Sequence, residues 1–227
     1  MSAPHPFSLI RAVLEPHGIF LRGAVHFAAS EGPVLGGGGH AASVALLGNI
    51  GGSLWPSFSR WLAAHPGVTD PLDTWSKERI GPLAAKLEAE AFFPSDPPWQ
   101  PFQQWAMRAE GMRPSPLGVL IHPVYGLWHG YRGALAFAER LPDVRQAAFT
   151  EHPCDRCREK PCLSSCPVSA VSAARFDVAA CRGYLATRPG CAGCMMAGCL
   201  ARAACPVGVE YRYPPEQLRF HMAALSL

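Results

Sequence analysis

The chain has 227 residues, of which 49% are hydrophobic and 16% charged, so it has enough apolar material for the core of one or two domains. Its net charge of +3 is too small to indicate nucleic-acid binding, and no apolar run of about eighteen residues predicts a membrane span. The N-terminus lacks the apolar stretch and cleavage site of a secretory signal, so a reducing cytoplasm is the expected compartment.

Two strands are predicted near the start of the chain. Residues 21–27 predict the first strand, and the apolar residues 44–48 predict a second, buried one. The glycine run at 36–39 is expected to form a loop between them. No Lys-Ser or Lys-Thr pair follows these glycines, so they do not form a phosphate-binding P-loop. Residues 1–150 as a whole predict an α/β or α+β domain.

Helix and loop signals follow. Asp70 is a typical N-cap, with Pro71 at the first helical position. The Gly-Pro pair further on is expected to break this helix and to begin a second helical segment at 82–90. Residues 92–101 predict a loop, and residues 102–110 predict a short helix that the next glycine closes.

The elements beyond this helix are predicted from apolar pattern and breakers. Residues 117–121 predict a buried strand, and residues 129–140 predict a helix whose apolar side chains face a sheet. Residues 169–185 are small and are expected to be partly helical. A final helix is expected from Pro215, packing back on the body of the protein.

All nine cysteines fall in the last third of the chain, between Cys154 and Cys205. Eight of them form two runs: CDRCREKPCLSSCP has the spacing C-x2-C-x4-C-x3-C-P, and CAGCMMAGCLARAACP has the spacing C-x2-C-x4-C-x5-C-P. The ninth, Cys181, lies between the runs. A [4Fe–4S] cube is held by four thiolates, one at each iron. Two quartets that each end in Cys-Pro therefore predict two such clusters.

The two predicted clusters interlock, because in two-cluster ferredoxins the last cysteine of a run ligates the other cluster. The first cluster is expected to take Cys154, Cys157, Cys162 and Cys205. The second is expected to take Cys166, Cys194, Cys199 and one more cysteine. Nine cysteines serve eight positions, and the internal repeat makes Cys191 the eighth ligand and leaves Cys181 over.

Disulfide bonds and structural zinc are alternative uses of these cysteines. Disulfides need an oxidising compartment, which the N-terminus does not indicate. Structural zinc also uses paired C-x2-C motifs, but usually without the Cys-Pro ending. The segment 154–205 also carries seven basic and three acidic residues. This excess of positive charge indicates a solvated basic face or a surface that docks an acidic electron donor.

The stretch LIHPVYGLWHGYRGAL, residues 120–135, resembles the segment before the ferredoxin module of epoxyqueuosine reductase, a cobalamin-dependent iron–sulfur enzyme. It also resembles the core of the cobalamin-processing (decyanase and dealkylase) family, whose architecture the reductive dehalogenases share. The upstream segments DPLDTWSKERIGPLAAKLEAE and AEGMRPSPLG align with these families loosely. The resemblance is specific around residues 117–135 and 154–205.

The resemblance implies an α+β fold, with a nitroreductase-like core of the cobalamin-reductase type followed by a two-cluster ferredoxin-like module. The implied domains are 1–150, which would bind a corrinoid, and 151–227, which would hold the clusters and a C-terminal helix. In epoxyqueuosine reductase a lone cysteine downstream of the first Cys-Pro ligates the second cluster. This feature favours Cys181, rather than Cys191, as the eighth ligand.

The resemblance also implies a set of cofactor-binding residues, because aromatic rings and a cation can contact a large flat corrin and its amide side chains. These residues are His122, Tyr125, Trp128, Tyr131 and Arg132. A tight turn for the first two and a packed core for the others are the alternative interpretations. Asp96 is the nearest counterpart of the catalytic aspartate of epoxyqueuosine reductase, and a solvent-facing turn is its alternative role.

Together these observations predict an iron–sulfur redox protein that passes single electrons through two [4Fe–4S] clusters to a cobalamin held by the N-terminal domain. A plain electron carrier without a corrin and a cluster-braced binding domain are the alternatives. The expected partners are an external electron donor of the flavodoxin or ferredoxin reductase type and a corrinoid. By analogy with nitroreductase-like domains, a homodimer is also expected.

Overall fold

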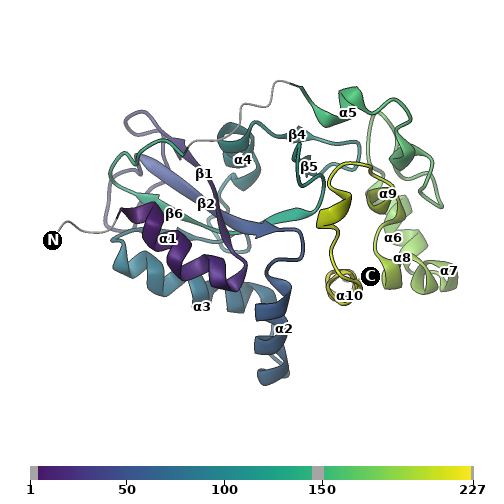
Figure 1. The fold of residues 1–227 in the computed structure, drawn as a ribbon, viewed down its shortest axis with the longest axis horizontal. Coiled ribbons are helices and arrows are strands. Elements are labelled where there is room, and N and C mark those ends of the chain that lie inside the picture. Colours follow the sequence, from purple (N-terminus) through teal and green to yellow (C-terminus); the bar gives the residue numbers. More distant parts are fainter. Residues whose placement is uncertain (1–4, 145–150, 226–227) are drawn as a thin grey trace. The chain divides into compact units, whose positions relative to one another are not determined.

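The computed structural model describes residues 5–144 and 151–225, and these divide into two compact units (Figure 1). The first unit contains the chain up to Gly111 and the segment that begins at His129. The second unit contains residues 112–128 and the C-terminal part from residue 151 onward. The boundary expected at residue 150 falls at the edge of 145–150, outside the described residues, and the segment 112–128 groups with the C-terminal part instead of the N-terminal one.

A four-stranded antiparallel sheet in the order β1-β2-β6-β3 forms the centre of the first unit. Its strands are β1 (Phe20–His26), β2 (Ser43–Ile50), β3 (Glu90–Phe92) and β6 (His129–Phe137). The strands expected at 21–27 and 44–48 are therefore confirmed. Because β2 is buried along nearly its whole length, both faces of the sheet are covered.

The prediction of a helix at 129–140 is wrong. This segment contains β6, a central strand paired with β2 on one side and β3 on the other. Its residues from Gly133 to Phe137 are all buried. A strand buried on both faces reads as a continuous apolar run, which periodicity cannot tell from a buried helix. The glycines at 130 and 133 are poor helix formers and were the available signal against a helix.

Helices surround this sheet. They are α1 (Pro6–Leu14), a 3-10 turn (Glu15–His17), α2 (Trp55–Ala64), α3 (Pro71–Lys86) and α4 (Phe102–Glu110). Helices α1 and α3 lie side by side, and α4 packs against β1 (Figure 1). The expected helix at 102–110 is confirmed, with Gly111 closing it in the left-handed conformation.

Helix α3 corrects the expectation of a break at Gly81-Pro82, because it runs without interruption from Pro71 to Lys86. Pro82 is exposed, so its missing N–H and its ring lie on the solvent side. Trp75 before it and Leu83 after it are buried, and this packing holds both halves of the helix in place. Asp70 does occupy the N-cap position, but its side chain makes no capping hydrogen bond.

The second unit is made of short elements and contains a two-stranded hairpin, β4 (Arg113–Pro114) and β5 (Leu120–Ile121). The buried strand expected at 117–121 is thus reduced to two residues. The longer helices are α6 (Val178–Leu185) and α10 (Pro215–Ala223), as expected from the sequence. The short ones are α5 (Pro153–Arg156), α7 (Arg188–Ala192), α8 (Cys194–Ala197), α9 (Leu200–Ala203) and 3-10 turns at Pro161–Leu163 and Val209–Tyr211.

The segment 112–128 belongs to the second unit because its backbone lies directly against the loop that follows α9. A Cβ added to Gly126 would come within 2.0 Å of the Val207 carbonyl oxygen. A Cβ added to Gly208 would come within 2.4 Å of the Tyr125 carbonyl carbon. Only glycine permits such an approach of two backbones. Within the described part of the chain, no helix is long and apolar enough to cross a membrane.

We expect Gly126→Ala to destabilise the second unit, because the added Cβ would clash with the backbone of Val207. Gly118→Ala is the matched control, because both glycines have positive φ, 57° and 76°, but Gly118 has nothing within 4 Å of its Cβ position. Both variants bear the left-handed strain of about 1 kcal/mol, and only G126A adds the clash, worth roughly 1–3 kcal/mol. Urea unfolding followed by tryptophan fluorescence measures the difference, and equal losses of stability would contradict the close packing.

Candidate functional site

Eight of the nine cysteines line two separate cavities of the second unit, four around each. The first cavity has a volume of about 70 Å³ and is lined by Cys154, Cys157, Cys162 and Cys205. Ile121, Val207 and the side chains of Lys160 and Asp155 complete its wall. The first three cysteines come from α5 and the turns after it, and the fourth comes from the loop that follows α9.

The second cavity has a volume of about 180 Å³ and is lined by Cys166, Cys181, Cys194 and Cys199. Apart from Tyr184, the rest of its wall is apolar, with Val171, Leu185 and Met222 among the lining residues. Each cavity therefore draws its sulfur atoms from both cysteine runs, as the interlocked arrangement predicts.

Local capping interactions hold these cysteines in position. The Asp177 side chain caps α6 by accepting a hydrogen bond from the Ala180 N–H at 2.9 Å, which orients the helix that carries Cys181. The backbone N–H of Ala170 donates to the Cys166 Sγ at 3.3 Å. Donation of this kind to a thiolate sulfur is what a cluster ligand requires.

Cys191 lies apart from both groups. It is exposed, whereas Cys194 and Cys205 are buried. Its Sγ donates to the Leu185 carbonyl at 3.4 Å and lines neither cavity. The internal repeat predicted Cys191 as the eighth ligand. In the structure it is Cys181, and not Cys191, that lines a cavity, with the seven other cysteines distributed over the two cavities.

Burial raises the pKa of the Cys154 thiol to about 11, and the neighbouring Cys205, Cys162 and Cys157 add to this rise. Burial likewise raises the pKa of Cys181, to which Cys199, Cys166 and Cys194 contribute. The thiols that interact electrostatically are the ones that share a cavity. The same direction holds, with burial as the first cause, for Cys162, Cys199 and Cys205.

All nine cysteines lie within the described residues, and none forms a disulfide bond. Within residues 5–144 and 151–225, no three His, Cys, Asp or Glu side chains are grouped so that they could hold a metal ion. The described part of the chain thus contains no preformed mononuclear site, and the two clusters stay a prediction.

Three of the five residues expected to contact a corrin belong to the second unit, and each has protein partners there. The His122 Nδ1 accepts hydrogen bonds from the Val124 N–H at 3.0 Å and the Tyr125 N–H at 3.2 Å. The Tyr125 ring stacks on the His122 ring at 4.1 Å and meets Tyr211 edge-on. Trp128 is only 1% exposed and packs edge-on against Tyr213. His122 therefore organises a turn that follows the short hairpin, not the end of a strand in a parallel sheet.

The other two, Tyr131 and Arg132, lie on β6 in the first unit. The Tyr131 hydroxyl donates to the Glu110 carboxylate, which also pairs with the Arg22 guanidinium at 2.8 Å. Burial raises the pKa of Glu110, and the positive charge of Arg22 opposes that rise. Arg132 forms a longer ion pair with Asp73 at 3.7 Å. These contacts engage both residues with neighbours inside the first unit, and their role in binding a corrin stays a prediction.

Asp96, the candidate catalytic aspartate, lies on the loop after β3 and pairs with Lys77 at 2.6 Å. The Ser95 hydroxyl also donates to its carboxylate at 3.3 Å. Both members of the pair are about two-fifths exposed. The geometry gives Asp96 the role of fastening a loop to α3, and its catalytic role stays a prediction.

Arg202 is a functional residue that sequence reasoning missed. Its guanidinium lies over the Trp128 ring at 4.3 Å and over the Tyr213 ring at 4.8 Å, and it donates to the Leu127 carbonyl. It thereby ties α9, which precedes Cys205, to the segment 112–128. Its position between two cysteines of the second run was the available signal.

The comparisons with known proteins give similar solved structures and no sequence relative. No family model matches the chain, and the search of the curated proteins found no match. Among the solved structures, the fold is similar to that of CblC, a B12-trafficking protein of C. elegans described as a homologue of human MMACHC. The TM-score is 0.52 at 13% identity, over 96% of this chain and 90% of CblC. The likeness confirms the α+β fold class, as a fold like that of CblC.

Replacing Arg202 tests its role between the two rings. We expect Arg202→Met to lower the free energy of unfolding by about 2 kcal/mol, because the cation–π contacts and a charged hydrogen bond are lost while the apolar stem remains. Arg219→Met is the control, since Arg219 makes only an exposed pair with Glu216 at 3.4 Å. Urea unfolding measures both variants, and a loss no larger than that of the control would rule out a bracing role.

Proposed function

We propose that this chain is an iron–sulfur redox protein that holds two [4Fe–4S] clusters in its second unit and passes single electrons to a cobalamin. The observation that carries the proposal is the grouping of eight cysteines, drawn from both motifs, around two cavities. Four thiolates per cavity is the donor set of a cube. When bound, each cluster exchanges one electron at a time.

Zinc and a cube differ in how far apart they hold four thiols. Zinc binds four sulfurs at about 2.3 Å, so a tetrahedral site brings the sulfurs to about 3.8 Å from one another. A cube spreads its four thiolates further apart, because each one binds a different iron. The cavity inside each quartet leaves room for a group larger than a single metal ion.

The cysteines would be the ligands, and their neighbours would tune them. Cys154, Cys157, Cys162 and Cys205 would hold the first cluster, and Cys166, Cys181, Cys194 and Cys199 the second. Lys160 at the first cavity and Arg182 beside Cys181 would offset the negative charge of the clusters. The apolar wall of the second cavity would limit the access of water to its inorganic sulfides.

The cobalamin part of the proposal is supported by the similarity of fold to CblC, a B12-trafficking protein. A bound cobalamin would supply a cobalt centre that accepts single electrons. Within each unit, however, the five expected corrin contacts are engaged with protein partners and line none of the three cavities described here. This observation favours a second candidate, a two-cluster electron carrier that binds no corrin.

Metal analysis tests the clusters. Anaerobically purified protein is expected to contain about eight irons and eight sulfides per chain and to show the broad cluster absorbance near roughly 400 nm. Cys181→Ser should lower the iron content by about half, because it removes a ligand of one cube, whereas Cys191→Ser should leave it unchanged. Colourless protein that contains zinc or no metal would refute the proposal, and a loss of iron only in the Cys191 variant would reverse the assignment of the eighth ligand.

Titration with hydroxocobalamin separates the two candidate functions. If a corrinoid binds, its absorbance bands shift with a 1:1 end point, and the unfolding midpoint rises with ligand concentration because only the folded chain binds. Glu110→Gln in the first unit is a useful comparison, since it disturbs the partner of Tyr131 and not the cysteines. Iron-loaded protein that shows neither change would leave the plain electron carrier as the function.

A further inference from the structure

The two cysteine cavities differ in the nature of their walls. The wall of the second cavity, which contains Cys181, is apolar except for the sulfur atoms and Tyr184. The wall of the first cavity includes two charged side chains, Lys160 and Asp155, and both residues are exposed. Charged side chains therefore border the first cavity, and none among the described residues lines the second.

Helix α10 closes the second cavity. Met222 near its C-terminal end and Leu225 just beyond it lie in the cavity wall. The helix packs on α8, and a Cβ at Gly198 would come within 3.0 Å of the Leu218 Cδ2. Gly198 stands next to Cys199 in the chain, so α10 rests directly on the loop that carries two of the four sulfurs. The expected final helix is thus the cover of one cysteine cavity.

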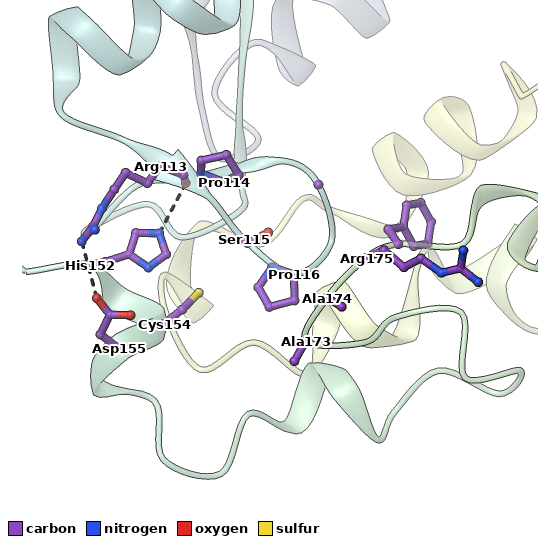
Figure 2. A pocket seen from close by; sticks show the side chains of 12 residues that line it. Arg113, Pro114, Ser115, Pro116, His152, Cys154, Asp155, Ala173, Ala174 and Arg175 are labelled. Atoms are coloured by element: carbon purple, nitrogen blue, oxygen red, sulfur yellow. Dashed lines mark hydrogen bonds and ion pairs between the residues drawn. The ribbon is translucent and has the colours of Figure 1, made fainter.

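A third cavity opens the first group further to solvent. It has a volume of about 510 Å³ and lies between the turn of the β4–β5 hairpin and the turn at 172–175 (Figure 2). Cys154 lies in its wall with its sulfur exposed to it, close to His152 and to the ion pair of Arg113 and Asp155 at 3.5 Å (Figure 2). One cysteine of the first group therefore borders both its own cavity and an open, polar one.

Polarity and solvent access set the potential of an iron–sulfur cluster. An electron adds negative charge to a cluster that is already an anion, so water and nearby cations stabilise the reduced state and raise the potential. An apolar wall provides no such stabilisation and lowers the potential. The two cavities of this chain offer these two environments.

We propose that the second cluster has the lower reduction potential, because its wall, to which α10 contributes Met222, is apolar, and that an electron given to the pair therefore settles on the first cluster. This inference rests on the proposed function. The step is a transfer of one electron, in which the second cluster is oxidised by one electron and the first is reduced by one, with no bond made and no proton moved. We assign the difference in potential to two residues. Met222 contributes an apolar side chain to the second cavity, and Lys160 contributes a positive charge to the first.

The test is a stepwise reduction of anaerobic, iron-loaded protein with dithionite, followed by electron paramagnetic resonance. We expect two separate midpoint potentials. A tenfold preference of the electron for the first cluster over the second corresponds to a gap of about 59 mV for a one-electron couple, and we expect the gap to be at least this large. Met222→Gln should raise only the lower midpoint, because it places a polar group of similar size in the dry wall. Lys160→Gln should lower only the upper one.

Met196→Gln is the matched control, since Met196 on α8 is 53% exposed and lines neither cysteine cavity. It should leave both midpoints unchanged. Iron-loaded protein with a single midpoint would overturn the inference and leave the clusters standing, as would a Met222 variant that moves the upper midpoint or behaves like the control. Iron-free protein would instead refute the proposed function itself, and the inference with it, so the two failures are distinct.

Discussion

The arrangement of the second unit depends on one constraint, the gathering of sulfur atoms from both ends of the cysteine-rich segment around the same cavities. Cys205 reaches back to the group that begins at Cys154, and Cys166 reaches forward to the group that contains Cys199. Short helices suit this arrangement, because each turn presents one or two thiols and then redirects the chain.

The rest of the unit supports this gathering. The segment 112–128 leaves the N-terminal sequence region and packs on the cysteine-rich part, through the backbone contact of Gly126 with Val207 and the stacking of Arg202 on Trp128. The buried residues Leu117, Ile121 and Leu127 form one apolar cluster with Val171 and Ala201, against which several cysteines pack. A stretch that the resemblance had assigned to a corrin site is therefore part of the wall that surrounds the thiols.

The environments of the two cavities connect this packing to redox chemistry. Apolar side chains, among them Met222 of α10, line the cavity of one group of thiols, while charged side chains and an open cavity border the other. The same apolar contacts that fold the unit would therefore also set the order of electron transfer. In the first unit, the buried Glu110 carboxylate is stabilised by the Arg22 guanidinium and the Tyr131 hydroxyl instead of by solvent.

Local signals in the sequence were enough for several elements. The strands at β1 and β2, the helix at α4 with its closing glycine, and the final helix followed from short-range rules, because alternation, caps and breakers act over a few residues. The grouping of thiols was also expected, since the spacing of the cysteines restricts which sulfurs can meet.

Tertiary structure decided the features that depend on distant neighbours. It made β6 a central strand, because pairing with strands on both sides outweighed an apolar pattern that a helix shares. It kept α3 continuous through Pro82, because buried side chains on either side hold the helix to the core. It also placed Cys181, and not Cys191, at the second cavity, because the direction of a capped helix determines where a thiol points and the spacing along the chain does not.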